Sequence, residues 1–219
     1  MNILIVSATQ FEVKPLLDLL EIGEPVTGLN QSLKKIHELK VDVLITGVGM
    51  VNTAYMMGRY SGNAYDLILN TGVCGAFDST IQLGSLVHVT ADILSELGAE
   101  DGEDFLTFDA LQLPGEHLFT NRLNKDVAMI STLNAVKGIT VNTVHGKESS
   151  IDKVKQLYAP DVESMEGAAF YAACVHSNAN YTQIRAVSNY VEKRDKSKWQ
   201  MPLAIKNLND FLIKLINDL

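Results

Sequence analysis

The chain has 219 residues, enough for one large domain with a substantial core, and no linker divides it. Its formal charge of −8 excludes a general binder of nucleic acids or anionic membranes, because both need a basic protein surface. With 47% hydrophobic and 20% charged residues, the composition is that of an ordinary globular protein. We therefore expect a small molecule as the partner.

Nothing in the sequence predicts export or a membrane span. No apolar run reaches the roughly 18 residues of a membrane-spanning helix, and the N-terminus lacks the basic region and cleavage site of a signal peptide. Cys74 and Cys174 stand in apolar surroundings, so we expect reduced, buried thiols in a cytoplasmic protein. The five histidines show no metal-ligand spacing, and we expect neither a metal nor another cofactor.

Strands and helices alternate in the first third of the chain. Short apolar runs rich in β-branched residues predict buried strands at residues 2–8, 41–46 and 67–70, and apolar spacing of three and four predicts helices at 10–20 and 51–60. Weaker signals between them suggest a strand at 25–27 and a helix at 31–39. Glycine pairs at 47–49 and 72–75 predict loops after two of the strands.

The remaining elements are less regular. Extended runs are predicted at residues 84–94 and 137–144, an acidic loop at 98–105, a polar helix at 147–158, a final strand at 181–187 and an amphipathic helix at 202–216. The alternation of strand and helix predicts an α/β fold with a predominantly parallel sheet.

A helix with an alanine-rich face is predicted within residues 161–173, with Ser164 as its N-cap. Small side chains let a helix lie close to a sheet, so we expect this helix to be central and Glu166, in its first turn, to be held rigidly. Taken alone, Glu166 could equally complement the helix dipole, which is worth roughly 0.3–1 kcal/mol.

Four unusual features follow predicted strands: Glu12, the two glycine loops and the pair Ser188-Asn189. Ligands of open α/β sheets bind at the carboxyl ends of the strands, so these features should converge. The glycines at 47 and 49 do not complete a dinucleotide fingerprint, because Asn52 stands where the third glycine belongs. No cation adjoins either glycine loop, which favours an uncharged ligand part such as a sugar or a base.

Several stretches together resemble the nucleoside phosphorylase and nucleosidase superfamily along nearly the whole chain. They are Glu12, Gly-Val-Gly at 47–49, Asn-Thr-Gly-Val-Cys-Gly at 70–75, Met-Glu-Gly-Ala-Ala at 165–169 and Arg-Ala-Val-Ser-Asn at 185–189. The resemblance implies a single domain over residues 1–219, with a three-layer α/β/α fold around a mixed, partly barrel-like sheet. It also implies a homo-oligomer.

Within that superfamily, the stretches at 96–102 and 188–195 and Trp199 most resemble the futalosine hydrolase family. That family belongs to menaquinone biosynthesis, and its substrate is a hypoxanthine nucleoside with a bulky aromatic carboxylate at the 5′ end. The resemblance therefore implies a nucleosidase acting on a 6-oxopurine nucleoside. We expect residues 98–105 and 142–145 to enclose the substrate.

The identity of the nucleophile follows from two positions. Phosphorylases of the superfamily hold phosphate with an arginine at the position of Asn70, and often with a serine at that of Val73. Without a cation, binding a doubly charged oxyanion in a partly dry site is costly. Water is the expected nucleophile.

The resemblance implies a role for each matched residue. Glu12 would activate the water and Arg185 would help to place it, whereas Glu166 would accept hydrogen bonds from the ribose and Met165 would pack on the ribose face. These hydrogen bonds would strengthen as positive charge grows on the sugar, which favours the transition state. Further substrate contacts would come from Val73, Cys74, Gly75 and Thr143. The plain structural alternatives are an exposed acid for Glu12 and an ion-paired strand-end arginine for Arg185.

Asn189 departs from the adenine-cleaving nucleosidases, which carry an aspartate at this position. An asparagine amide can donate to a carbonyl oxygen at position 6 but cannot transfer a proton near neutral pH. A mismatched, buried adenine would cost roughly 1–3 kcal/mol. We therefore expect hypoxanthine as the base, while the group that protonates it stays open.

Two other functions fit the same residues. One is a related nucleosidase or phosphorylase acting on inosine or methylthioadenosine. The other is a catalytically silent nucleoside-binding protein, which would have no need for the carboxylate of Glu12.

Overall fold

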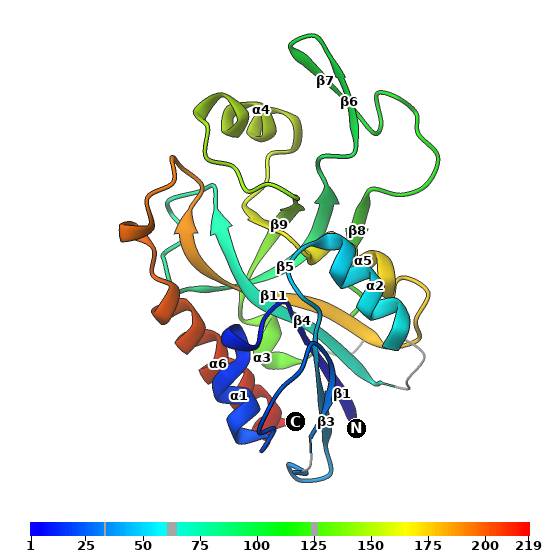
Figure 1. Ribbon diagram of the computed structural model, residues 1–219, viewed down its shortest axis with the longest axis vertical. Helices are drawn as coiled ribbons and strands as arrows, with labels where there is room; N and C mark the ends of the chain where they lie inside the picture. Colours follow the sequence, from blue (N-terminus) through cyan, green and yellow to red (C-terminus); the bar gives the residue numbers. More distant parts are fainter. Residues whose placement is uncertain (33, 61–64, 124–126) are drawn as a thin grey trace.

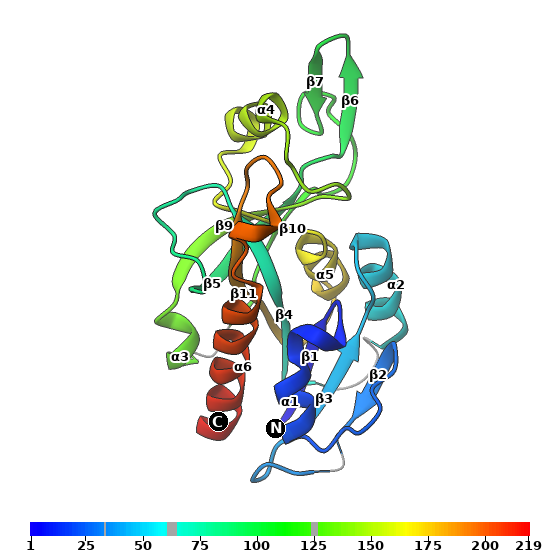
Figure 2. The same cartoon turned by 60° about the vertical axis from the view of Figure 1, so that its left-hand side comes forward.

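A mixed sheet runs through the molecule, with helices on both of its faces (Figures 1 and 2). The computed structural model describes residues 1–32, 34–60, 65–123 and 127–219. The helices are α1 (Lys14–Leu19), α2 (Met50–Tyr60), α3 (Ala128–Ser131), α4 (Glu148–Tyr158), α5 (Gly167–Cys174) and α6 (Met201–Asp218), with the 3₁₀ helices η1 (Gln10–Val13) and η2 (Lys196–Lys198). The strands are β1 (Asn2–Ser7), β2 (Gly28–Gln31), β3 (Lys40–Ile45), β4 (Leu67–Ala76), β5 (Leu86–Leu94), β6 (Gly98–Asp101), β7 (Asp104–Thr107), β8 (Leu118–Thr120), β9 (Asn134–Thr140), β10 (Val162–Ser164) and β11 (Asn180–Tyr190).

Part of the sheet closes into a barrel-like ring. The strand order is β10-β9-β5-β11-β4-β1-β3-β2, and β10 also pairs with β4, which joins the two ends of the ring. Among the described residues, the parallel pairings of this sheet are β1–β3, β1–β4, β4–β11, β5–β9 and β9–β10, and the antiparallel ones are β2–β3, β4–β10, β5–β8 and β5–β11. The parallel pairings outnumber the antiparallel ones, so the predictions of a predominantly parallel sheet and of a mixed, partly barrel-like α/β fold are both confirmed.

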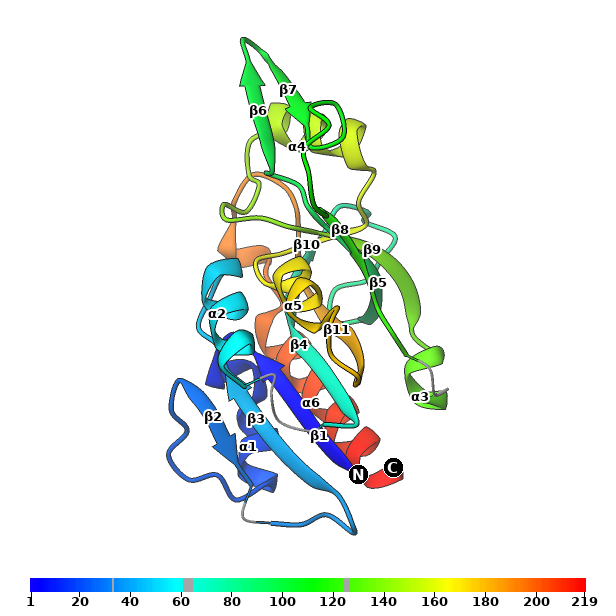
Figure 3. The same cartoon turned by 90° about the vertical axis from the view of Figure 1, so that its right-hand side faces the viewer.

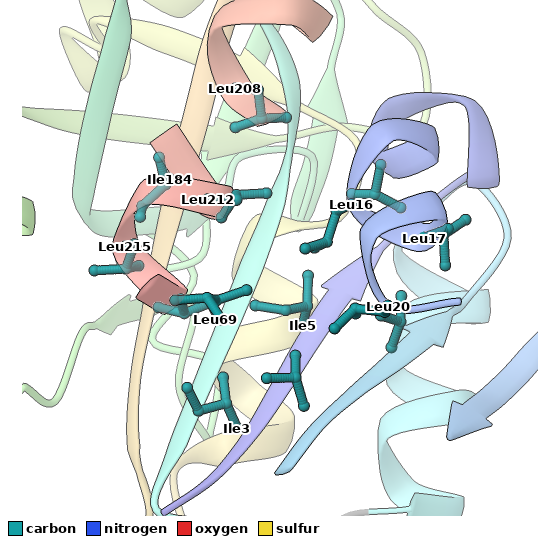
Figure 4. Close-up of a cluster of buried hydrophobic side chains, with 14 of the residues drawn as sticks. Ile3, Ile5, Leu16, Leu17, Leu20, Leu69, Ile184, Leu208, Leu212 and Leu215 are labelled. Atoms are coloured by element: carbon teal, nitrogen blue, oxygen red, sulfur yellow. The ribbon is translucent and has the colours of Figure 1, made fainter. Parts of the chain in front are cut away.

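Alternate side chains of β1 pack against the helical layers on opposite faces of the sheet. Ile3 and Ile5 point to the core under α1 and α6, where Leu212 and its neighbours are fully buried (Figure 4). Leu4 and Val6 point the other way, to the core under α2 and α5. A strand buried on both faces must be apolar at every position, which explains the unbroken apolar run. The helical layers hold this strand rigidly, together with the site beyond its end.

Two weak predictions between β1 and β3 are wrong. Residues 25–27 lie outside any strand, and the strand β2 that forms next to them pairs antiparallel with β3. No helix forms at 31–39 among the described residues, and residue 33 lies outside them. His37 has a positive φ of 54° in the turn between Ile36 and Leu39, a conformation that ends any helix. Gln31 belongs to β2, and the turn closed by the bridge between Ile36 and Leu39 takes the place of the predicted helix.

The predicted acidic loop at 98–105 is wrong as well. It is a β-hairpin of β6 and β7 that projects beyond the sheet beside α4 (Figure 3). The two turn residues are Gly102 and Glu103, and Gly102 has a φ of +62°. A glycine at the first position of a two-residue turn is a hairpin signal, which the acidic composition obscured.

Three predicted boundaries near the ligand-binding edge also differ. The glycines at 72–75 continue β4, and Ser188-Asn189 continue β11, because these two strands pair parallel up to Ala76 and Tyr190. Ser164 is the last residue of β10 rather than an N-cap. Glu166 itself is the N-cap residue of α5, which begins at Gly167.

Candidate active site

A cavity of about 460 Å³ opens where β1, β4 and β11 end and α5 begins. This volume suits a nucleoside-sized ligand. Seven of the predicted site residues line the cavity: Glu12, Val73, Cys74, Gly75, Met165, Glu166 and Asn189. The structure therefore brings together residues that are far apart in the sequence.

Glu12 is held in place by its own turn and by β4. Its Oε2 accepts hydrogen bonds from the backbone N (3.0 Å) and Oγ1 (2.9 Å) of Thr9, the N-cap residue of η1. Its Oε1 accepts one from the backbone N of Val73 at 3.1 Å. These bonds fix the carboxylate at the cavity wall, where it can accept a proton from a bound water molecule.

Glu166 is almost fully buried, with 6% of its surface exposed. Its Oε1 accepts a hydrogen bond from the backbone N of Gly49 at 3.0 Å, and its Oε2 lies 3.5 Å from Nη1 of Arg185. Burial raises the pKa of Glu166, while the charge of Arg185 and the Gly49 hydrogen bond oppose that rise. The glycine loop at 47–49 thus positions a carboxylate rather than a ligand phosphate.

Arg185 lies beneath the cavity and does not line it. Only 1% of the residue is exposed, and its Nη2 donates hydrogen bonds to Oδ1 of Asn70 and, at 3.4 Å, to Oε1 of Gln183. Asn70 donates its own amide to the carbonyl oxygen of Val6 at 3.2 Å. The guanidinium therefore influences the cavity indirectly. It lies beside the carboxylate of Glu166 and next to the backbone of Gly72.

Gly72 is the point where the side chains of Glu12 and Arg185 approach each other. A Cβ atom at this position would lie 2.7 Å from Oε1 of Glu12 and 2.8 Å from Nη1 of Arg185. Both distances are shorter than real carbon contacts, so any larger residue would displace one of these groups. Residue 72 is therefore a glycine because the side chains of Glu12 and Arg185 lie close to its backbone, and not because the chain turns there.

Asn189 lies at the other end of the cavity from this cluster, beside Gly75. Its Oδ1 accepts a hydrogen bond from Oγ of Ser188 at 2.8 Å, and its Nδ2 donates to the carbonyl oxygen of Tyr190 at 3.0 Å. A Cβ at Gly75 would lie 3.2 Å from this Nδ2. The amide is thereby oriented by protein contacts, and one N–H of Nδ2 is left to donate to a ligand.

Thr143 is exposed and lies outside the cavity lining. Its backbone N donates to Oε1 of Glu96 at 3.3 Å, and Asn142 is bonded to the same carboxylate. The neighbouring Val144 and His145 do line the cavity, whereas the hairpin at 98–107 does not. Of the two segments expected to enclose the substrate, 98–105 does not line the cavity, and 142–145 does so only through Val144 and His145.

Cys74 lines the cavity, but its thiol is not a nucleophile there. Burial raises the pKa of its thiol to about 12, so the thiolate that nucleophilic chemistry needs is not formed near neutral pH. Cys74 and Cys174 are both buried and free, in agreement with the sequence prediction.

Several lining residues carried no sequence signal. They include Phe11, Glu163 and Met201. Glu163 is only 4% exposed and pairs with His145, yet these residues come from different segments and share no motif. Only the closure of the strand ring brings them to the cavity.

The described residues offer neither a cluster of metal ligands nor a membrane-spanning helix. Within the ranges that the structure describes, no group of three or more His, Cys, Asp or Glu side chains could hold a metal ion. Of the helices in those ranges, none combines the length and the hydropathy that a membrane crossing requires.

A buried carboxylate lies behind the site. Asp92 is 1% exposed and accepts hydrogen bonds from Oγ1 of Thr140 (2.8 Å) and Nε2 of Gln183 (3.1 Å). Burial raises the pKa of Asp92 to about 6, although these hydrogen bonds and the charge of Arg185 oppose the rise. By holding the amide of Gln183, Asp92 turns the Gln183 oxygen towards Arg185.

The fold and this site place the chain in a known class. The phosphorylase superfamily model matches residues 2–217, and the chain belongs to that superfamily. Among curated proteins, the futalosine hydrolase of Thermus thermophilus is 31% identical over 172 residues, which cover 75% of this chain and 76% of the relative.

Solved structures agree on the fold. A 5′-methylthioadenosine/S-adenosylhomocysteine nucleosidase of Helicobacter pylori has a TM-score of 0.84 at 15% identity, covering 100% of this chain and 99% of that one. A futalosine hydrolase of the same organism has a TM-score of 0.82 at 14% identity, with coverages of 100% and 98%. The predicted resemblance to the superfamily, and within it to the futalosine hydrolases, is confirmed.

Replacing Gly72 tests the close approach. In Gly72→Ala, the new methyl group displaces Glu12 or Arg185, so we expect kcat/KM for nucleoside cleavage to fall at least about 100-fold while the circular dichroism spectrum is kept. Gly58→Ala, in α2, is the matched control, since a Cβ there meets nothing within 4 Å. Equal activity of the two variants would contradict this account of Gly72.

The raised pKa of Asp92 predicts a pH-dependent stability. The unfolded chain ionises this group near its ordinary value of 3.8 and the folded protein near 6, so its contribution to the unfolding free energy falls as pH rises from about 4 to 6. Relative to Asp92→Asn, the parent should lose about 3 kcal/mol across this window, at 1.36 kcal/mol per pKa unit. Urea unfolding of both proteins at several pH values measures the difference. Parallel pH curves would show that Asp92 ionises normally.

Proposed function

We propose that this protein is a futalosine hydrolase: it cleaves the N-glycosidic bond of futalosine with water and releases hypoxanthine and dehypoxanthine futalosine, a step of menaquinone biosynthesis. Membership of the phosphorylase superfamily and the identity to a curated futalosine hydrolase support this reaction. The site geometry supports it independently.

The observation that carries the proposal is the use of the backbone amides. The amide of Gly49 is taken by the carboxylate of Glu166, and that of Val73 by the carboxylate of Glu12. Phosphate bound here would face two carboxylates, and the guanidinium of Arg185 beside them already serves Glu166. The cost of placing a dianion beside them is prohibitive, whereas a neutral water molecule fits.

In the proposed reaction, a water molecule sits between Glu12 and the sugar. Glu12 accepts a proton from this water as its oxygen attacks C1′, and Arg185 keeps the neighbouring surface positive. Glu166 accepts hydrogen bonds from the ribose hydroxyl groups, which strengthen as the sugar acquires oxocarbenium character. Met165, which lines the cavity between β10 and α5, packs on the ribose face.

Asn189 selects the base in this proposal. Ser188 fixes the amide with its oxygen occupied, so the free N–H of Nδ2 donates to the carbonyl oxygen at position 6 of hypoxanthine. The amino group of adenine is itself a donor at that position and would leave a polar group unpaired. This favours futalosine over methylthioadenosine, which the name of one structural neighbour, the Helicobacter pylori nucleosidase, gives as a substrate.

The far wall of the cavity supplies the positive charge that the 5′ carboxylate needs. Lys193 and Arg194 line the cavity, and the guanidinium of Arg194 lies 4.9 Å from the ring centroid of Trp199. Stacking on an aromatic ring holds an arginine in place while its N–H groups stay free for a carboxylate. We assign the 5′ carboxylate of the substrate to Arg194.

We further infer a cytoplasmic homo-oligomer. Val51 and Tyr55 on α2 are 75% and 60% exposed, and Phe11 and Val48 at the cavity mouth are 71% and 50% exposed. A large apolar surface next to a ligand site is typical of a subunit interface. Two free, buried cysteines accord with a reducing compartment.

Product analysis tests the reaction. In phosphate-free buffer, we expect hypoxanthine release from futalosine, little or none from inosine, and no adenine release from methylthioadenosine. Glu12→Gln should lower kcat by roughly 10²–10⁴, the range for a lost general base, whereas Glu24→Gln, at an exposed site, should keep full activity. Adenine release would overturn the role of Asn189. Binding of futalosine without cleavage would favour a silent nucleoside-binding protein.

Exchanging the base selector gives a second test. Asn189→Asp supplies a carboxyl group that accepts from an amino group and can donate a proton, so adenine release from methylthioadenosine should appear. The ratio of kcat/KM values for the two substrates should move towards methylthioadenosine by at least about tenfold, in line with the 1–3 kcal/mol of a mismatch. An unchanged ratio would show that base selection lies elsewhere.

Introducing a charged side chain on α2 tests the proposed subunit interface. Val51→Asp should shift the protein from an oligomer to a monomer in analytical ultracentrifugation, because burying an unpaired charge at an apolar interface is costly. Lys206→Asp, on the exposed side of α6, serves as the control. A monomeric parent would refute the inference.

A further inference from the structure

One buried pair at the base end of the cavity has no part in the steps above. Oε2 of Glu163 lies 2.7 Å from Nδ1 of His145, and Oε1 accepts a hydrogen bond from the backbone N of His145 at 3.1 Å. Both residues line the cavity, and Glu163 is 4% exposed. A buried carboxylate locked to an imidazole at a ligand-binding wall is more than packing requires.

The ring of strands places this pair next to the base selector. Gly75 of β4 pairs with Glu163 of β10 on one side and with Asn189 of β11 on the other. A Cβ at Gly75 would lie 3.2 Å from Nδ2 of Asn189 and 3.6 Å from Cγ of Glu163. The missing side chain of Gly75 therefore leaves one space that Asn189 and the Glu163–His145 pair share.

The reaction needs an acid in that space. When the C1′–N9 bond breaks, its electron pair stays on the purine, and a proton on a purine ring nitrogen makes the base a far better leaving group. Asn189 cannot supply a proton, and the raised pKa of Cys74 removes its thiol from consideration. Glu12 and Glu166 lie at the sugar end, around Gly72 and Gly49.

We propose that His145, oriented by Glu163, is the general acid that protonates the departing purine. This assignment rests on the proposed hydrolysis. Glu163 accepts the Nδ1–H of the ring, which fixes the tautomer and stabilises the protonated imidazole. Among the described residues no hydrogen bond engages Nε2, so this nitrogen is the one that delivers the proton.

The proton balance closes without a cofactor. The Nε2 proton of His145 passes to the purine as the C1′–N9 bond breaks, and Glu12 takes a proton from the water that adds to C1′. After the products leave, Glu12 returns its proton to solvent and His145 takes one up. With 15% of its side chain exposed, His145 can exchange with solvent from the cavity.

The test compares one nucleoside with its N7-methylated form. Methylation places a fixed positive charge on the purine, which then leaves without a proton but keeps its carbonyl group at position 6. In His145→Gln, kcat for futalosine should fall roughly 10²–10⁴-fold, whereas kcat for N7-methylfutalosine should fall less than about tenfold. Glu163→Gln should show the same pattern with a smaller loss, and His176→Gln, at an exposed histidine, should match the parent.

The outcomes separate the possible roles. Equal losses on both substrates would overturn the acid role and leave His145 as a binding or structural residue, and unchanged activity would exclude it altogether. Base release by the parent is the internal reference: if the parent cleaves neither substrate, the proposed hydrolysis itself fails, and this assignment fails with it.

Discussion

The site depends on one buried guanidinium. Arg185 is almost completely enclosed, and its charge is shared between Glu166, which lies 3.5 Å away, and the amide oxygens of Asn70 and Gln183. A buried charge of this kind is tolerated only when it is paired and hydrogen bonded, and removing one partner of such a pair costs about 3–5 kcal/mol. The partners in turn fix the neighbouring strands: Gln183 and Arg185 come from β11, and Asn70 comes from β4. The contacts that hold Arg185 near Glu166 thus also fix how β4 and β11 lie relative to each other.

Glycines in strands, rather than in loops, make this arrangement possible. Gly72 leaves the space in which Glu12 meets Arg185, and Gly75 leaves the space between Asn189 and Glu163. Gly167 has the same function behind the site, where a Cβ would collide with the side chains of Asp92 and Gln183. Each glycine is a point at which two functional side chains from other segments converge over one strand or helix. Because Gly72 and Gly75 have no side chains, residues from other segments can lie against the backbone of β4 and form the cavity wall.

Much of this could be read from the sequence, and the limits have physical reasons. Uninterrupted apolar runs predicted β1 and β3, because a strand buried on both faces has few alternatives, and the ordered motifs predicted the superfamily. The glycines at 72–75 were misjudged as a loop, since local composition cannot reveal that β4 is paired on both sides. The pairing of His145 with Glu163 could not be predicted, because it depends on β10 lying beside β9, the strand that leads into the segment of His145. The predicted helix at 31–39 is wrong because a tight turn with a positive φ at His37 interrupts it, and the weak apolar spacing does not reveal that turn.

The central claim is that two carboxylates occupy the place where a phosphorylase would hold phosphate, so that water attacks the sugar. The most direct measurement is the cleavage of futalosine in ¹⁸O-labelled water containing a saturating concentration of phosphate, with mass analysis of the sugar product. This account predicts one ¹⁸O atom at C1′ of dehypoxanthine futalosine and no sugar 1-phosphate. A sugar 1-phosphate without ¹⁸O at C1′ would contradict it.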